Sequence, residues 1–448
     1  MDIAQERHPL SVLLKCRGWT SAAFLHMLAE RHRKLGYGGI ASRKEKVSRW
    51  IAGVSVPAIT TQYAMADLLQ IHRREVTAHG WPSWLCLAIH DDRVVLESPW
   101  TAAGSLKVLG EVGGPVDRRA FLIASTHTLA AMAAQWATAE PATASTSGRR
   151  IGAEVADQLD TRLAALRHLD DEIGAGHVYD AATTEIRLIR RLLSEAAYSE
   201  QVGRRLFGAA AEACRLAGWC AYDNGYHAEA ERQFFAAMRS AASAGDETIG
   251  ALTLAFWANQ RYATGTPRVA LDMLERALAS RRITSGRVTA LLYARQARAY
   301  SLMGEAVPAY RAAEAAFTAY GKAGPAGEDL PALYWMNMGE LHQFAGSAAL
   351  SLGEPRRALE HFDAAVRGED AYDSGQEARG AAIYLARRAE AHLAIGDLDA
   401  AVEVAEQVLQ LMGGVESARG GSALQDLRAE LLHHKDVPVV SGFLDLTA

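Results

Sequence analysis

The side chains best suited to chemistry in this sequence are the hydrogen-bond donors clustered in residues 44–49. These donors are Lys44, Lys46, Ser48 and Arg49. The same segment carries an apolar set at other positions, namely Val47, Trp50 and Ile51. A helix with an apolar back and a polar front can pack onto a domain while its front enters the major groove of DNA. The pattern therefore indicates contact with an anionic partner such as duplex DNA.

No catalytic or metal-binding motif accompanies these donors. The sequence has no GxxxxGK, HExxH or GxSxG motif, and no GxGxxG motif after a strand, so nucleotide-binding, metalloprotease and hydrolase chemistry lack support. The acidic run Asp170-Asp171-Glu172 is typical of a helix end, and His433 and His434 point in different directions on a helix. We therefore expect no enzyme activity, no cofactor and no metal site.

The charge distribution agrees with an anionic partner near one end of the chain. Residues 1–80 hold 12 Lys and Arg against 6 Asp and Glu, which gives this part a net charge of +6. Because the whole chain carries −5, the remainder carries −11. An excess of this size is compatible with nucleic-acid binding and also with chance, so charge alone leaves both open.

Signals for export or membrane insertion are missing from the sequence. No stretch of 18 or more apolar residues occurs, and residues 1–20 lack the apolar core of a signal peptide. The four cysteines form no CxxC pair and are too sparse for a disulfide framework in 448 residues. We expect a cytoplasmic protein without a membrane partner.

Residues 1–80 are predicted to form one small domain of four or five helices. Thr20 and Ser42 are good N-cap residues for two of these helices. Gly53 can end the second one, and Pro57 can begin the next. Short helices separated by such turns fit a single compact globule.

The segment Lys46-Val-Ser-Arg-Trp50-Ile-Ala-Gly53, followed by a turn with Pro57, resembles the phage-repressor-like (XRE-type) helix-turn-helix family. The resemblance implies a DNA-binding domain over residues 1–80. It implies contacts to the bases from Lys44, Glu45 and Arg49, and contacts to phosphate or the groove edge from Arg43 and Lys46, with Ser48 as a further candidate. Ile51 stands where the family usually has glutamate, so a head that only packs or dimerises is the alternative.

The composition changes after this domain. Residues 81–137 contain Trp-Pro-x-Trp-Leu at their start and are predicted to be a helical connector. Residues 138–150 are small and polar with one proline, which is typical of a flexible linker. Residues 151–448 are rich in alanine and show no alternating strand pattern, so the expected fold class is all-α.

A repeat is visible within this last part. Its anchors are Gly225, Gly265, Gly304, Gly353 and Gly396. An alanine follows each anchor by five residues, and a glycine or alanine precedes each by seven. Small residues at fixed places allow two antiparallel helices joined by a glycine turn to approach closely. The anchors are 40, 39, 49 and 43 residues apart.

These columns resemble the tetratricopeptide repeat, although the family period is 34 residues and the turn tyrosine is absent here. The resemblance implies a tetratricopeptide-like α-solenoid over residues 151–448, with a groove lined by the first helix of each pair. The residues that it places in this groove are Arg215, Trp219, Tyr222, Asn259, Tyr262, Arg298, Gln343 and Glu390. Their amide, guanidinium and aromatic groups suit a peptide or small-molecule ligand.

The two halves together resemble actinobacterial regulators of development and secondary metabolism. The resemblance implies a DNA-binding transcriptional regulator whose repeats sense a peptide, a small molecule or a protein partner. Because such heads usually bind paired half-sites, we expect a homodimer. The alternative is a tetratricopeptide scaffold or adaptor whose degenerate head does not read DNA.

Overall fold

A computed structural model describes residues 8–16, 19–40, 45–69, 71, 73–82, 84–85, 93–113, 132, 135–136, 138–280, 282–367, 378–412 and 418–446. The described residues are mostly helical, so the expected all-α class is confirmed. They divide into two compact units, one up to Arg93 and one from Val94 onward. None of the described helices is long and apolar enough to cross a membrane.

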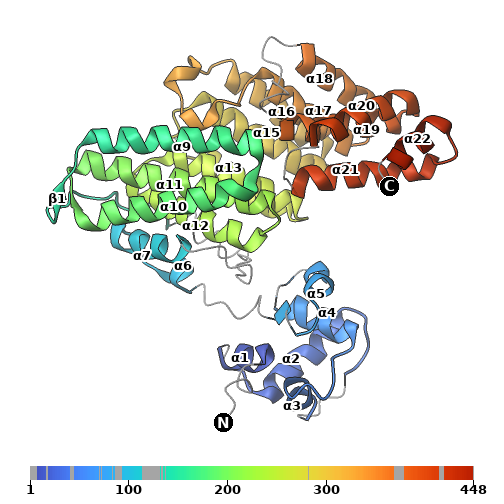
Figure 1. Cartoon of the computed structure of the whole chain (residues 1–448), viewed down its shortest axis with the longest axis horizontal. Helices are drawn as coiled ribbons and strands as arrows, with labels where there is room; N and C mark the ends of the chain where they lie inside the picture. Colours follow the sequence, from blue (N-terminus) through green and yellow to red (C-terminus); the bar gives the residue numbers. More distant parts are fainter. Residues whose placement is uncertain are drawn as a thin grey trace. The chain divides into compact units, whose positions relative to one another are not determined.

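The first unit consists of short helices around one apolar core (Figure 1). Its helices are α1 (Pro9–Cys16), α2 (Ser21–Lys34), α3 (Glu45–Ile51), α4 (Ile59–Leu68) and α5 (Arg73–His79). Thr20 caps α2 as expected, because its hydroxyl accepts a hydrogen bond from the Ala23 amide at 3.1 Å. Arg31 on α2 forms an ion pair with Asp67 on α4.

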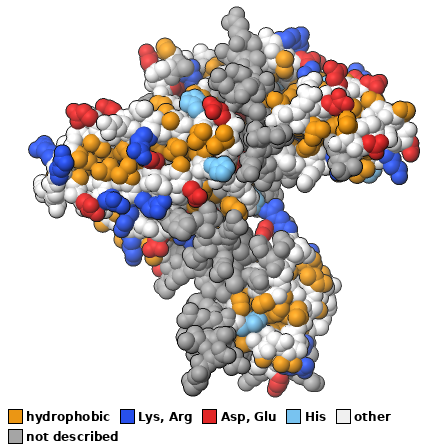
Figure 2. Space-filling view, viewed as in Figure 1, with side chains coloured by type: hydrophobic (Ala, Val, Ile, Leu, Met, Phe, Trp, Pro, Cys, Tyr) orange, Lys and Arg blue, Asp and Glu red, His pale blue; other side chains and the backbone are white. Residues whose placement is uncertain are grey.

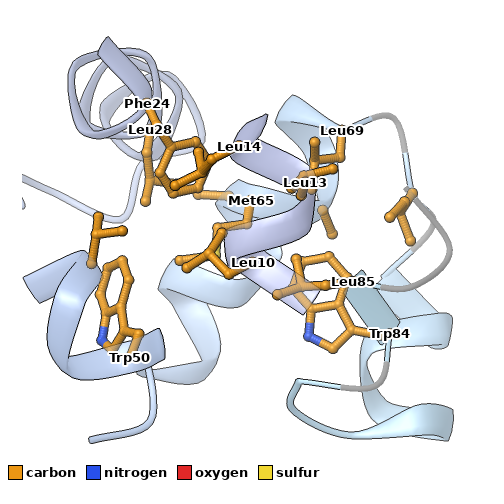
Figure 3. Close-up of a cluster of buried hydrophobic side chains, with 14 of the residues drawn as sticks. Leu10, Leu13, Leu14, Phe24, Leu28, Trp50, Met65, Leu69, Trp84 and Leu85 are labelled. Atoms are coloured by element: carbon orange, nitrogen blue, oxygen red, sulfur yellow. The ribbon is translucent and has the colours of Figure 1, made fainter. Parts of the chain in front are cut away.

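Apolar side chains from each part of this unit converge on its core (Figure 3). Leu10, Phe24 and Met65 are fully buried there, and Trp50 anchors α3 to the same cluster. The buried polar atoms next to the core are paired: the Trp84 indole donates to the Gln62 side chain at 3.0 Å, which in turn donates to the Pro57 carbonyl at 2.9 Å. The position of α3 is therefore fixed by its apolar back.

The second unit begins with helices that pack against its body. These are α6 (Arg93–Glu97), α7 (Ala102–Val112), α9 (Ala153–Ile173) and α10 (Ala175–Glu195). Helix α7 packs on α10 and on a later helix, α12 (His227–Ala244). Buried Arg239 on α12 donates hydrogen bonds to the carbonyls of Val95, Leu96 and Ser98 at 2.7–3.0 Å. Residues 94–113 of the predicted connector are therefore part of this unit, whereas its first described residues, such as Trp84 and Leu85, belong to the core of the first unit.

Residues 138–150 are attached to the second unit and do not form the flexible linker that their composition predicted. Strand β1 (Arg149–Arg150) pairs in parallel with β2 (Ala196–Ala197). Ser145 and Tyr198 exchange two backbone hydrogen bonds, and the Ala142 amide donates to the Ser243 carbonyl at 2.7 Å. These long-range bonds cannot be read from a polar composition. On the face drawn in Figure 2, basic side chains gather around β1.

Five successive helix pairs make up the body of the second unit (Figure 1). They are α11 (Glu200–Asp223) with α12, α13 (Glu247–Ala263) with α14 (Pro267–Leu278), α15 (Gly286–Leu302) with α16 (Ala306–Tyr320), α17 (Met338–Ser351) with α18 (Pro355–Arg367), and α19 (Ala378–Ala394) with α20 (Leu398–Met412). Helices α21 (Ala418–Leu431) and α22 (Pro438–Leu446) follow. Neighbouring first helices also contact one another directly.

The five anchor glycines lie in the turns between the paired helices, with φ between 77° and 85°. This left-handed conformation strains any residue that has a Cβ atom, which explains why glycine recurs there. The small residue seven positions earlier has a second cause. A Cβ on Gly218 would lie 2.8 Å from the Phe234 ring, and one on Gly346 would lie 2.7 Å from the Phe362 ring. Glycine is thus required where the second helix contributes phenylalanine.

Candidate functional site

Helix α3 presents a polar face outward while its apolar face is buried. Val47 and Trp50 are buried, whereas Glu45, Ser48 and Arg49 are exposed and Lys46 is half-buried. Among the described residues, the Arg49 guanidinium has no hydrogen-bond or ion-pair partner. The two other predicted DNA contacts, Arg43 and Lys44, lie outside the described residues. The described part of the predicted reading face is therefore accessible.

The segment after α3 carries an apolar surface that was not predicted. Val54, Val56 and Ile59 are 65%, 64% and 47% exposed. They follow the exposed Arg49 and Ala52 in the chain, so that basic and apolar side chains occur close together. Alternation of valine with serine in Val54-Ser-Val56 would have been the only signal in the sequence.

The predicted groove residues occur on the first helices of the pairs, which form what we call the first-helix face (α11, α13, α15, α17 and α19). Trp219 and Glu390 are half-buried. The others are buried, namely Arg215, Tyr222, Asn259, Tyr262, Arg298 and Gln343. Six of the eight predicted groove residues are therefore buried where neighbouring first helices contact one another.

The predicted residues on α11 make contacts between helices. Arg215 forms two hydrogen bonds with Glu212, at 2.6 and 2.8 Å, and its guanidinium lies 4.2 Å from the centre of the Phe256 ring. Glu212 also accepts a hydrogen bond from Arg167 on α9 at 3.0 Å. Trp219 packs edge-on against Phe256, with ring centres 5.0 Å apart. This part of the face has a packing role.

A segment of the chain itself covers these aromatic residues. It lies between α16 and α17 and includes the short helix η4 (Pro331–Leu333), which contacts α9. The Trp335 ring lies 5.9 Å from Phe256, and the Tyr334 ring lies 4.6 Å from His168. The Tyr334 hydroxyl donates to Asp171. This insertion accounts for the longest anchor interval, the 49 residues between Gly304 and Gly353.

At α15, α17 and α19 the first-helix face is polar. Two arginines on α15 contact residues on α17. Arg295 donates to the Tyr262 hydroxyl at 2.6 Å and lies 4.6 Å from the centre of the Phe344 ring. Arg298 donates to the Ser347 carbonyl and, at 3.0 Å, to the Ser351 hydroxyl. Arg295 was not predicted, although it lies one helical turn before Arg298 in the sequence.

The charges in this region explain a shifted pKa. Burial, together with the like charges of Arg387 and Arg295, lowers the pKa of Arg298 to about 9. Burial also raises the pKa of the Glu390 carboxyl. The Tyr384 hydroxyl donates to Glu340 at 2.5 Å, and the charge of Glu340 helps to keep Arg295 protonated. The region is a buried polar cluster with an excess of arginine.

No group of three or more His, Cys, Asp or Glu side chains in the described part of the chain is arranged to hold a metal ion. Two histidines, His342 and His361, do lie together, with their Nδ1 atoms 3.1 Å apart. Comparison with known proteins adds no assignment, because no protein-family model and no curated protein sequence matches the chain. The argument for function therefore depends on the residues themselves.

Proposed function

We propose that the protein is a DNA-binding transcriptional regulator whose helical-repeat unit senses a ligand or a protein partner. The observation that carries the proposal is the outward polar face of α3, on which Arg49 is exposed and has no partner among the described residues, together with a buried apolar back. This is the arrangement that a recognition helix needs in the major groove. In this proposal the first unit is a helix-turn-helix domain formed around α2 and α3.

The finer fold assignment of the second unit is part of the same proposal. We infer a tetratricopeptide-like solenoid from the five helix pairs, their recurring glycine turns and the packing between neighbouring first helices. The resemblance to regulators of development and secondary metabolism supports action on DNA in the cytoplasm. Ligand contact is proposed for the part of the first-helix face that carries Arg298, Asn259, Tyr262, Gln343 and Glu390.

The proposal is tested with full-length protein and a duplex sequence selected from a random pool. Arg49→Ala should reduce discrimination against mismatched sites by about 1–3 kcal/mol, because this guanidinium is assigned to a base. Lys46→Ala should weaken binding to all duplexes by a similar factor, because this ammonium is assigned to phosphate. The slope of log affinity against log salt concentration should become shallower by about one. Arg276→Ala, an exposed position on α14, is the matched control. Unchanged affinity and discrimination in both α3 variants would refute the assignment.

A homodimer is the expected binding form, because one short recognition helix makes few contacts and paired half-sites double them. Multi-angle light scattering of the free protein and a footprint on the selected duplex measure this together. A monomer that protects a single half-site contradicts the expectation.

A second function, a scaffold whose head binds protein, is favoured by the apolar surface next to α3. The side chains of Val54, Val56 and Ile59 are exposed beside the polar face of α3 that is proposed to bind DNA, and exposed apolar patches often mark protein contacts. If this surface is the functional one, Val54→Ser with Val56→Ser abolishes partner capture, and no duplex is enriched by selection.

A further inference from the structure

The buried arginines of the second unit differ in how their charge is balanced. Several have a carboxylate within ion-pair distance: Arg167 and Arg215 on Glu212, Arg261 on Glu231, and Arg287 on Asp329. Arg239 instead reaches several carbonyl oxygens at the end of α6. This pairing is the expected outcome, because removing an unbalanced charge from water is costly.

Arg295 and Arg298 are compensated only at longer range within the described residues, by the charge of Glu340 near Arg295 and that of Glu390 near Arg298. They are 7% and 5% exposed, and neither has a carboxylate within ion-pair distance. The described acceptors of Arg298 are all neutral and all bond Nη1, so Nε and Nη2 have no partner in the described part of the chain. Among the residues that the structure describes, the Tyr262 hydroxyl is the only acceptor of Arg295, whose Nε is buried without a partner.

Arg387 on α19 adds a third positive charge to the same place. Its charge helps to lower the pKa of Arg298, and the carboxyl of Glu390 on the same helix interacts with both arginines. Arg387 is half-buried and has no ion pair with a described residue. Since α15 and α19 both contact α17, the three arginines belong to one stretch of the first-helix face.

We propose that Arg295, Arg298 and Arg387 bind an oxyanion, the carboxylate or phosphate group of the ligand that the second unit senses. The inference rests on the proposed sensor function and names the chemical class of its ligand. Guanidinium groups suit this class because their planar donors match a carboxylate or phosphate oxygen pair. Phe344 and the Tyr262 hydroxyl hold Arg295 in position, and Ser347 and Ser351 hold Arg298.

Binding is measured without DNA on the full-length protein by calorimetric titration and by thermal unfolding. The probes are succinate and inorganic phosphate, with sodium chloride at matched ionic strength as the reference. We expect saturable binding of at least one of the two probes beyond the effect of chloride. A response to succinate alone assigns a carboxylate ligand, and a response to phosphate alone assigns a phosphate ligand.

Three variants distinguish ligand binding from a packing role. Arg298→Met and Arg387→Gln should each weaken probe binding at least tenfold, while Arg311→Gln, an exposed position on α16, should leave binding unchanged. Arg387 is half-buried, so its variant tests the site even if Arg298→Met fails to fold. Arg298→Met should also unfold at the same or a higher temperature without probe, because a purely structural arginine would lower it.

The outcomes separate this inference from the proposed function. Wild-type protein that binds neither probe beyond chloride, or variants that bind as tightly as wild type, overturn the oxyanion site whatever the DNA assay gives. Saturable binding that the variants lose supports the site. If the same probe then leaves affinity for the selected duplex unchanged, the site stands and the sensor function fails.

Discussion

The contact between His342 and His361 makes the stability of the second unit depend on pH. Their Nδ1 atoms lie 3.1 Å apart, so that one imidazole donates and the other must be a neutral acceptor. Burial lowers the pKa of His342, and burial with the charges of His342 and Arg357 lowers the pKa of His361. Each ring is therefore more easily protonated in the unfolded chain than in the folded one.

The sign of the pH effect follows from this difference in pKa. Stability is complete above the ordinary histidine pKa of about 6.5 and is lost as the pH falls through the lowered folded values. We predict that the free energy of unfolding in urea decreases from pH 7.5 to pH 5.5, and that His361→Gln flattens this decrease. His177→Gln, an exposed position on α10, should retain it. An equal slope in both variants contradicts the assignment to this pair.

Individual residues differed in how far the sequence could predict them. The outward face of α3 was predictable because Val47 and Trp50 lie three positions apart and occupy one side of any helix. The burial of Arg215 was not, because it depends on Glu212 and on Arg167, which arrives from a helix far earlier in the chain. Polar groups on a helix surface look alike in sequence until the partner helix is known.

At the scale of elements, Arg239 holds the C-terminal end of α6 on the body of the second unit. Its guanidinium donates to the carbonyls of Val95, Leu96, Ser98 and Pro99, which a helix end leaves without intrahelical partners. We predict that Arg239→Met lowers the free energy of unfolding by about 3 kcal/mol, since hydrogen bonds from a charged donor contribute about 1.5–3 kcal/mol.

The location of the effect distinguishes this anchor from general destabilisation. Hydrogen exchange should accelerate at the amides of α6 and α7 more than at those of α19 and α20 in Arg239→Met. Arg276→Met, which replaces an exposed arginine on α14, should change neither exchange nor stability. Uniform acceleration across the unit would show that α6 has no separate anchor.

The segment that includes η4 covers the aromatic part of the first-helix face through few side chains. Trp335 is half-buried against Phe256, and Tyr334 contacts His168 and Asp171. We predict that Trp335→Ala lowers the free energy of unfolding by about 2 kcal/mol, roughly half of the loss expected for a fully buried tryptophan. Limited proteolysis should then cut within residues 321–337 earlier than in the wild type. Unchanged cleavage would mean that Trp335 does not hold the segment down.

The helix pairs were predictable because each turn requires glycine and each close contact requires a small residue. These two demands fall at fixed spacings and so appear as columns in the sequence. The inserted segment appeared only as a longer interval between Gly304 and Gly353. Its path to α9 depends on Tyr334 and Asp171, which are 163 residues apart, and no local pattern encodes such a contact.

At the scale of the whole molecule, the two units have separate sources of stability. The apolar cluster of the first unit draws its buried side chains from residues 10–85. Further clusters belong to helices α17–α22 of the second unit. Helix α7 packs on α10 and α12 of the same unit, and Arg239 on α12 binds the carbonyls of α6. A domain of about 80 residues buries a smaller fraction of its surface than a larger one and is correspondingly less stable.

We therefore predict two transitions when the full chain is unfolded in a calorimeter, the lower one from the first unit. A chain that begins at residue 87 keeps α6 and α7 and should lose only the lower transition. Its remaining Tm should stay within about 2 °C of the upper transition, since 1 kcal/mol shifts the Tm of a large domain by about 2–4 °C. Arg239→Met should lower this upper Tm equally in both chains, because its partners lie within the second unit. A single cooperative transition, or a shift of the upper Tm beyond about 5 °C on truncation, would mean that the first unit stabilises the second.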